Sequence, residues 1–329
     1  MDLIMMSSSN TETVSDARKD GWNEALEKNS DLKRLSAKAF NTFLMDLHET
    51  NGMPDLFHKK PIVLDLGGKE PLLSYNVQKS FEAMNIDGVD YNIVTQIQNP
   101  YYQRVLKGAT VVKGDMFAPA DRMNEELPMK SDPDIVLASH ALVDSKNVID
   151  SVRNISTQLK KPSSLAIFVS HSQNDDLSHY IRKFTSLTEP GKELKGILKK
   201  LRIKHHTIHT KGHVFFPEIS DELWKELQAA KPYNDNTNPH SAHADGLNVR
   251  KLVESVINRP LESLSTTERK DYLGDLRKKL KTQKYQGKSY ISSDKIIEVV
   301  LSPHVNRQTE LAVERGVAAT NKSLSEIQK

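Results

Sequence analysis

The stretch IVLDLGG, residues 62–68, decides the fold class of this chain. It is an apolar run of strand length that leads directly into two glycines. In open α/β sheets a ligand sits at the carboxyl end of a strand, and glycine lets it approach the backbone where a Cβ would collide. Two glycines are also typical of an ordinary tight turn between a strand and a helix. The neighbouring segments have to decide between these two interpretations.

Four further runs of strand length follow along the chain. They are short apolar or β-branched segments at residues 91–95, 110–112, 135–138 and 165–169. Most are separated from the next by a stretch long enough for a crossover helix. This alternation predicts βαβ units, and hence a doubly wound α/β fold with a mostly parallel sheet and helices on both faces.

Regular elements are also predicted on either side of these runs. Before them, Trp22, Leu35 and Phe43 belong to a roughly helical spacing, which predicts two helices broken near residues 29–30. Beyond them, the expected elements are a helix at 176–201 with a break at Pro190-Gly191, a sixth strand at 203–210, helices at 219–230, 247–257 and 266–280, and two short apolar stretches within 288–301 around Ser292-Ser293-Asp294.

The amino-acid composition is typical of an ordinary water-soluble protein. Hydrophobic residues make up 37% and charged residues 27% of the chain, which is enough apolar surface to close a core. The longest apolar runs fall far short of the roughly 20 residues that a membrane helix needs. No signal-peptide pattern and no cysteine is present, which fits a reducing compartment. We therefore expect a cytoplasmic protein with no membrane partner.

The charge pattern argues against nucleic acid as a partner. The formal net charge is only +3, and the Lys and Arg residues are interspersed with acids instead of forming a basic stripe. Four histidines, His205, His206, His209 and His213, crowd one segment, but alternation along a strand would turn His206 away from the other three. Because no acidic ligand lies close in sequence, no metal site is predicted.

Polar residues end the predicted strands and form the candidate ligand site. Gln96 follows the second strand, where sheets of this class place a group for ribose hydroxyls, although it is equally an ordinary polar strand end. Asp115 follows the third strand and could accept from an adenine amino group while Met116 or Phe117 packs on the ring; alternatively it caps the next helix. The fourth strand ends at Ser139 and delivers His140 to the same edge.

In this order, the residues resemble the class I methyltransferases, and the layout is similar to the small-molecule methyltransferases related to histamine N-methyltransferase. The resemblance covers residues 31–303 and rests on VLDLGG, on IKHHTIHTKGH followed by ISDELWKELQAAKPYN, and on DYLGDLRKKLKTQKYQGKSYISSDKIIEVV. It implies S-adenosylmethionine as cofactor, held by Asp65, Gly67 and Gly68 together with the polar strand ends. It also implies a small-molecule methyl acceptor.

The resemblance also implies a domain layout. We expect a disordered N-terminus at 1–14, one methyltransferase-like domain at 15–303 and a polar tail at 304–329. Within the domain, the expected parts are a helical lid at 15–60, a cofactor-binding core at 61–210, and a substrate-side extension with the last strands at 211–303.

Several positions depart from the family pattern. Residues 69–71 read Lys-Glu-Pro where the glycine loop of the family continues, and Gln96 replaces the usual acid. The substrate-facing glutamine of the family falls on His140 and its late asparagine falls near Ser293. An acid of the lid that meets the substrate amine falls near Asp31.

One further segment lies at the expected substrate edge. Ser170-His171-Ser172 suggests a nucleophile and a base, but no glycine elbow places a serine on a strained turn. We interpret it as the exit of the fifth strand, with His171 among the substrate-binding residues.

These observations lead to two hypotheses. The first is transfer of a methyl group from S-adenosylmethionine to an amine or hydroxyl of a small molecule, with His140 orienting or deprotonating the acceptor. The second is a methyltransferase-like fold that has lost catalysis and serves as a binding or interaction module, motivated by residues 69–71 and Gln96. Both N- and O-methylation, and any oligomeric state, remain open.

Overall fold

The structure is a computed structural model, and its described residues form two compact units. The first, called the small unit, contains residues 215–290 and 183–185 with those up to Asn29; the second, called the sheet unit, contains 30–182, 186–214 and 291–329. The structure describes residues 24–26, 28–50, 53–57, 60–66, 72–95, 106, 108–127, 129, 131–139, 141–145, 147–172, 174–184, 191–230 and 244–327.

A mostly parallel seven-stranded sheet forms the centre of the sheet unit. Its strands lie in the order β3-β2-β1-β4-β5-β10-β6. The five strands β1 to β5 pair in parallel, whereas β10 is antiparallel to both of its neighbours. The bounds are β1 (Ile62–Leu66), β2 (Asp90–Thr95), β3 (Thr110–Lys113), β4 (Ile135–Ser139), β5 (Leu165–His171), β6 (His205–Thr210) and β10 (Lys295–Leu301). The predicted α/β fold class is confirmed.

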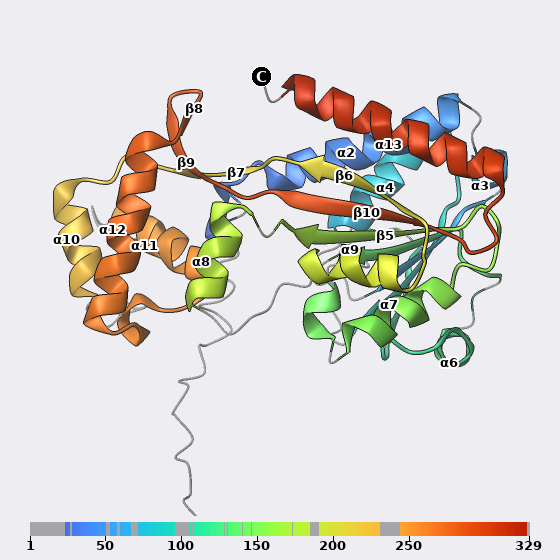
Figure 1. The fold of residues 1–329 in the computed structure, drawn as a ribbon, viewed down its shortest axis with the longest axis horizontal. Coiled ribbons are helices and arrows are strands. Elements are labelled where there is room, and N and C mark those ends of the chain that lie inside the picture. The colour runs from blue at the N-terminus through green and yellow to red at the C-terminus, as the bar shows by residue number, and fades with distance from the viewer. Residues whose placement is uncertain are drawn as a thin grey trace, which may run out of the picture. The chain divides into compact units, whose positions relative to one another are not determined.

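Helices cover both faces of this sheet (Figure 1). Because side chains alternate along a strand, Val63 joins the apolar cluster on one face and Leu64 the cluster on the other. One face is covered by α2 (Leu32–Glu49), α3 (Pro54–Phe57), α4 (Leu72–Ala83) and α13 (Arg307–Ile327); the other by α6 (Ala120–Glu126), α7 (Val148–Thr157) and α9 (Gly191–Lys200). Helix α8 (Asp176–Phe184) follows β5, and the short 3-10 helix η1 (Ala141–Asp144) follows β4.

Helix α2, which was expected to belong to a lid, is part of the core of the sheet unit. Phe43, Leu44 and Leu47 are at most 1% exposed and share one apolar cluster with the strands and with α13. A helix that buries this much apolar surface against the sheet stabilises the fold itself. Deleting this helix should therefore remove part of the core.

The expected polar tail at residues 304–329 is mostly helix α13, and this helix packs on α2 and β6. The buried positions of α13 recur every three or four residues, which is the pattern of a helix with one covered face. They are Thr309, Ala312, Val313, Gly316, Val317, Thr320 and Leu324. Several of these side chains are small or carry a hydroxyl, so the stripe does not stand out as hydrophobic in the sequence.

A close approach of α13 to α2 occurs at Gly316. A Cβ added at Gly316 would lie 3.4 Å from side-chain atoms of Phe43, Asp46 and Leu47. We expect Gly316→Leu to lower the free energy of unfolding by about 1–3 kcal/mol, because the larger side chain would force the helices apart. Urea denaturation measures this change. The matched control is Gly274→Leu, which faces open space on another helix and should gain stability through helix propensity. Equal stability of the two variants would contradict the packing.

The small unit is built from helices and a short sheet. Its helices are α10 (Asp221–Ala229), α11 (Ala244–Ile257), the 3-10 helix η2 (Leu261–Ser263) and α12 (Thr266–Thr282). The sheet has the order β7-β9-β8, with β7 (His213–Phe216), β8 (Lys284–Tyr285) and β9 (Lys288–Ser292). Helices α10, α11 and α12 match predicted segments, whereas β7 and β8 were not predicted.

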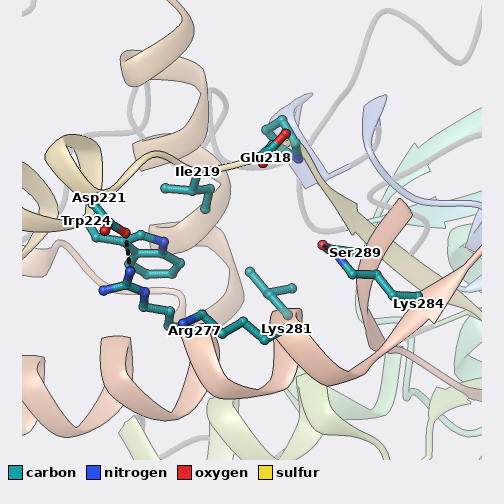
Figure 2. A pocket seen from close by; sticks show the side chains of 10 residues that line it. Glu218, Ile219, Asp221, Trp224, Arg277, Lys281, Lys284 and Ser289 are labelled. Atoms are coloured by element: carbon teal, nitrogen blue, oxygen red, sulfur yellow. Dashed lines mark hydrogen bonds and ion pairs between the residues drawn. The ribbon is translucent and has the colours of Figure 1, made fainter. Parts of the chain in front are cut away.

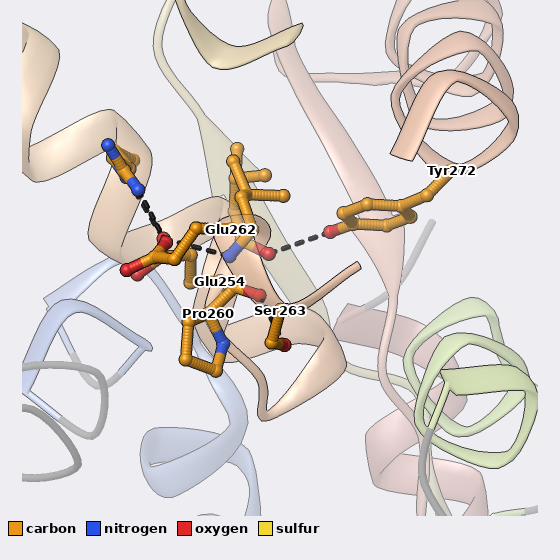
Figure 3. A network of polar contacts seen from close by, with 8 residues as sticks. Glu254, Pro260, Glu262, Ser263 and Tyr272 are labelled. Carbon is orange, nitrogen blue, oxygen red and sulfur yellow. Dashed lines mark hydrogen bonds and ion pairs between the residues drawn. The ribbon is translucent and has the colours of Figure 1, made fainter. Parts of the chain in front are cut away.

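Buried polar contacts hold the helices of the small unit together (Figure 3). The hydroxyl of Tyr272 in α12 donates to the carbonyl of Val253 in α11 at 2.7 Å. The carboxylate of Glu254, 1% exposed, accepts from Arg250 Nε at 2.9 Å and from the backbone N–H of Leu261 at 3.1 Å. A buried carboxylate is tolerated when it is paired and hydrogen-bonded in this way. The segment 215–290, which was expected to extend the substrate side of one domain, thus has a core of its own.

Candidate functional site at the carboxyl edge of the sheet

The carboxyl edge, where the parallel strands end, brings the predicted ligand residues of the sheet unit together. Because β10 runs antiparallel, its first residue, Lys295, pairs with His171 at the end of β5 and with Thr210 at the end of β6. The turn that precedes β10 contains Ser293, so Ser293 lies at the same edge. The carboxyl end of an open α/β sheet is the usual position of a ligand crevice.

Four of the predicted site residues lie outside the described residues. These are Gly67 and Gly68 of the glycine turn, Gln96 after β2, and His140 after β4. Their predicted roles stay predictions. The described flanks agree with the expected local structure, because β1 ends at Leu66 and α4 begins at Leu72.

Asp65 is buried in β1 and joins this strand to α4. It is 2% exposed, and its Oδ2 accepts a hydrogen bond from the hydroxyl of Ser74 in α4. Burial raises the pKa of Asp65 to about 6, and the hydrogen bond from Ser74 acts in the opposite direction. The described contact of Asp65 therefore indicates that it holds β1 and α4 together, whereas the family resemblance implied direct cofactor binding.

The raised pKa of Asp65 makes stability depend on pH. The folded carboxyl binds its proton more tightly than the unfolded one, so this contribution is fully present below about pH 4 and is lost as pH rises toward about 6. We expect wild type to lose on the order of 2 kcal/mol relative to Asp65→Asn between pH 4 and pH 7. Denaturation of both proteins at several pH values measures the difference. Parallel stability profiles would contradict a raised pKa at this position.

The other described cofactor candidates lie at or near the ends of β3 and β4. Asp115 is exposed, and its Oδ1 accepts from the backbone N–H of Phe117 at 3.0 Å. Helix α6 begins at Ala120 with Pro119 as its N-cap, so the alternative that Asp115 caps this helix is wrong. Met116 is 2% exposed within the apolar core, which leaves half-buried Phe117 as the more accessible apolar side chain.

Ser139 ends β4, where it pairs with Val169 of the neighbouring strand. It is half-buried, in contrast to the fully buried residues before it in the strand. This change in burial places Ser139 at the carboxyl edge, as the sequence predicted. Its role toward a cofactor stays a prediction.

Asp31 ties the start of α2 to residue 213 at the beginning of β7. Its Oδ1 accepts from the backbone N–H of His213 at 2.7 Å, and its Oδ2 lies 2.9 Å from His213 Nδ1. Its own N–H donates to the carbonyl of His213 at 3.2 Å. A substrate amine at Asp31 would therefore have to share this carboxylate with His213.

Two aspartates at the start of α8 hold the turn before β10, and we call these contacts the aspartate clamp. Asp175 Oδ2 accepts from the N–H of Asp294 at 2.7 Å, while its Oδ1 accepts from the N–H of Ser178 at 2.6 Å. Asp176 Oδ2 accepts from both the N–H and the hydroxyl of Ser292, each at 3.0 Å. Residues far apart in sequence thereby fix the segment that carries Ser293.

Burial raises the pKa values of carboxyl groups at the aspartate clamp. It raises the pKa of Asp175 to about 7, and the nearby carboxylate of Asp294 adds to the rise while the backbone hydrogen bonds oppose it. Burial also raises the pKa of Asp294. Clusters of buried titratable groups with perturbed pKa values are typical of functional sites, although structural networks produce them too.

His171 presents a neutral imidazole at the end of β5. Burial lowers its pKa to about 3, and the positive charge of Lys295 adds to the effect. A histidine with this pKa stays neutral above about pH 5, so it would not produce a rate change near neutral pH.

Two buried hydroxyls at this edge have no hydrogen-bond partner among the described residues. The two hydroxyls are Ser170 Oγ and Ser293 Oγ. Ser170 is 7% exposed and Ser293 is 0% exposed. A buried hydroxyl without a partner costs about 1–3 kcal/mol. Polar atoms held in this state need an explanation, and a ligand that bonds to them supplies one.

Sequence reasoning missed the aspartate clamp, and the roles that it gave to Ser293, Asp31 and His171 stay predictions. The signal was Asn-Asp-Asp directly before a helix, which is typical of an N-cap and carries no indication of a distant partner. Within the described part of the chain, no three His, Asp or Glu side chains come together as metal ligands. No helix among the described residues is long and apolar enough to cross a membrane.

The strand order β3-β2-β1-β4-β5-β10-β6, with antiparallel β10 inserted between β5 and β6, is that of the class I methyltransferase fold. No protein-family model matches the chain, and no curated protein matches its sequence.

Two solved structures show low similarity to the chain. One is an O-methyltransferase family protein from Burkholderia thailandensis, with 13% identity and a TM-score of 0.35 over 58% of this chain. The match spans 65% of that protein, which is less than two thirds of its length. The other is the cyclase SpnF, with 10% identity and a TM-score of 0.35 over 77% of this chain and 80% of SpnF. Strand order and direction, and not these low similarities, identify the fold.

Proposed function

We propose that this chain is an S-adenosylmethionine-dependent methyltransferase that acts on an amine or hydroxyl of a small molecule. Fold alone does not imply activity. The observation that carries the proposal is the pair of buried, unpartnered hydroxyls of Ser170 and Ser293. They lie at the edge where this fold binds its ligands, beside a turn that the aspartate clamp holds in place.

The cofactor half of the site would be formed by the ends of β1 to β4. Gly67 and Gly68 would let the cofactor approach the backbone, while Gln96 and Asp115 would meet its ribose and adenine and Ser139 would line the same edge. S-adenosylmethionine supplies a methyl group on a sulfonium that is already a good leaving group. The part that the chain has to play is therefore alignment of the acceptor and exclusion of water.

The acceptor half would be formed by β5, the turn before β10 and residue 140. The hydroxyls of Ser170 and Ser293 can donate to or accept from a polar acceptor group. His140 would orient the acceptor or take its proton, and Asp31 would meet an acceptor amine while it shares a carboxylate with His213. This arrangement resembles the acceptor site of the histamine N-methyltransferase group, with His140 and Ser293 in place of its amides.

An acceptor has to be found before turnover is measured. Small amines and phenols would be screened with the full chain for transfer of a labelled methyl group from S-adenosylmethionine. Binding of the cofactor without transfer to any acceptor would favour the alternative of a catalytically inactive binding module. Transfer to one class decides between N- and O-methylation.

Ser293→Ala then tests the acceptor site. Removing a buried hydroxyl without a partner should leave the stability of the ligand-free chain unchanged or raise it by up to about 1–3 kcal/mol, whereas the loss of one hydrogen bond to the acceptor should raise the KM of the acceptor about tenfold. The matched control is Ser302→Ala, because Ser302 is 1% exposed and donates to the carbonyl of Leu159 at 2.9 Å. This control should lower stability by about 1–3 kcal/mol and leave KM unchanged. An unchanged KM in Ser293→Ala would remove Ser293 from the site.

A further inference from the structure

The small unit contains a pocket whose lining residues are not among those assigned to the methyltransferase site. Its volume is about 290 Å³, just below the usual range for small-molecule sites. Helices α10 and α12 and strands β8 and β9 supply most of its lining. Figure 2 shows Trp224 and Asp221 on one side of the pocket and Lys284 and Ser289 on the other.

One side of the pocket is apolar. Trp224 and Leu280 are 5% and 6% exposed, and half-buried Ile219 lies with them in the lining. The guanidinium of Arg277 lies 5.8 Å from the centre of the Trp224 ring and pairs with Asp221. This ion pair balances the charge of Arg277, so the Trp224 side of the pocket offers apolar surface to a ligand.

Two lysines at the pocket, Lys281 on α12 beside Arg277 and Lys284 on β8, carry positive charges that no carboxylate of the described residues neutralises (Figure 2). In the described part of the chain neither Lys281 nor Lys284 forms an ion pair, and the ammonium of Lys284 donates only to the neutral hydroxyl of Ser289. Both lysines line the pocket. Glu218 is exposed at the same pocket and carries one negative charge. Since Arg277 and Asp221 balance each other, the two lysines and Glu218 give the pocket a net charge of one positive unit.

We propose that this pocket binds a small molecule that carries one anionic group on an apolar body, such as an aryl-alkyl carboxylate. The apolar body would lie against Trp224 and Ile219, and the carboxylate would meet Lys281 and Lys284. The inference goes beyond the proposed methyltransferase activity and needs no bound cofactor. If the ligand does not bind, the proposed methyltransferase activity is not contradicted, and the reverse also holds.

The test is a calorimetric titration of the full chain with 4-phenylbutyrate. Expected results are saturable binding that weakens as salt is raised, much weaker binding of the uncharged 4-phenylbutanol, and no binding of inorganic phosphate at the same concentration. Binding of the alcohol as tightly as the acid would overturn the role of charge. Binding of phosphate as tightly would overturn the role of the apolar side.

Four variants test whether the ligand binds in this pocket. Lys281→Gln and Lys284→Gln should each weaken binding about fivefold to tenfold, since each removes a charge-assisted hydrogen bond. Glu218→Gln should strengthen it about twofold, because it removes a like charge from the pocket. Lys278→Gln is the matched control, because this exposed lysine of α12 does not line the pocket, and it should change nothing. Equal effects of the three lysine substitutions would overturn the site.

Tryptophan fluorescence tests the position of the bound ligand independently of calorimetry. The chain has two tryptophans, so Trp22→Phe leaves Trp224 as the only reporter. Emission of this variant should shift on titration with 4-phenylbutyrate at the same midpoint as the heat signal. A heat signal without any change in Trp224 emission would place the ligand elsewhere and contradict the proposal.

Discussion

Replacing Gly68 by valine is expected to weaken binding of S-adenosylmethionine at least about 100-fold while the fold persists. The substitution adds a branched Cβ directly after β1, where a ligand at the carboxyl edge has to approach the backbone. The hydrogen bond between Asp65 and Ser74 joins β1 to α4, so the change should stay local. Calorimetric titration and thermal unfolding of the same sample measure both effects.

The matched control is Gly196→Val. Gly196 lies in α9 and faces open space, so a valine there should leave cofactor affinity unchanged. If Gly68→Val bound the cofactor as tightly as this control, the glycine turn would not be the cofactor site.

Phe43→Ala is expected to destabilise the protein by about 3–5 kcal/mol. The ring is 1% exposed and lies in the apolar cluster shared by α2, the sheet and α13, so truncation would leave a cavity between them. Urea denaturation measures the loss. Lys38→Ala, on the exposed side of the same helix, should change stability by less than about 0.5 kcal/mol.

The same packing predicts the outcome of a truncation. A chain that begins at Met53 lacks α2 entirely, so we expect it to fail to form the sheet unit instead of losing only activity. A truncated chain with a cooperative melting transition and native sheet content would show that α2 is a lid after all.

The strands were predictable because each is a short run of apolar or β-branched residues, and β1 lies within the residues that carry the family resemblance. The parallel direction of most strands then follows from the βαβ alternation, whereas the order of the strands was not predicted. The packing of helix α13 was not predictable, because small or hydroxyl-bearing residues such as Ala312, Gly316 and Thr320 interrupt its apolar face. Strand β8 has only two residues, which is too short to produce a pattern.

The candidate site was predictable only in part. His171 follows from the position of a strand end, whereas Ser293 was implied by the family resemblance. The aspartate clamp does not, because Asp176 and Ser292 are 116 residues apart and no local pattern indicates such a contact. Asp65 shows the opposite case, since its place in the motif suggested a ligand contact while its burial and its bond to Ser74 indicate a positioning role.

The central claim is that the carboxyl edge of this sheet holds S-adenosylmethionine. Calorimetric titration of the full wild-type chain with S-adenosylmethionine tests it most directly. The predicted result is saturable binding with one site per chain and a Kd at or below roughly 100 μM, or about −5.5 kcal/mol. Absence of any saturable heat at millimolar cofactor, from protein that unfolds cooperatively, would contradict it.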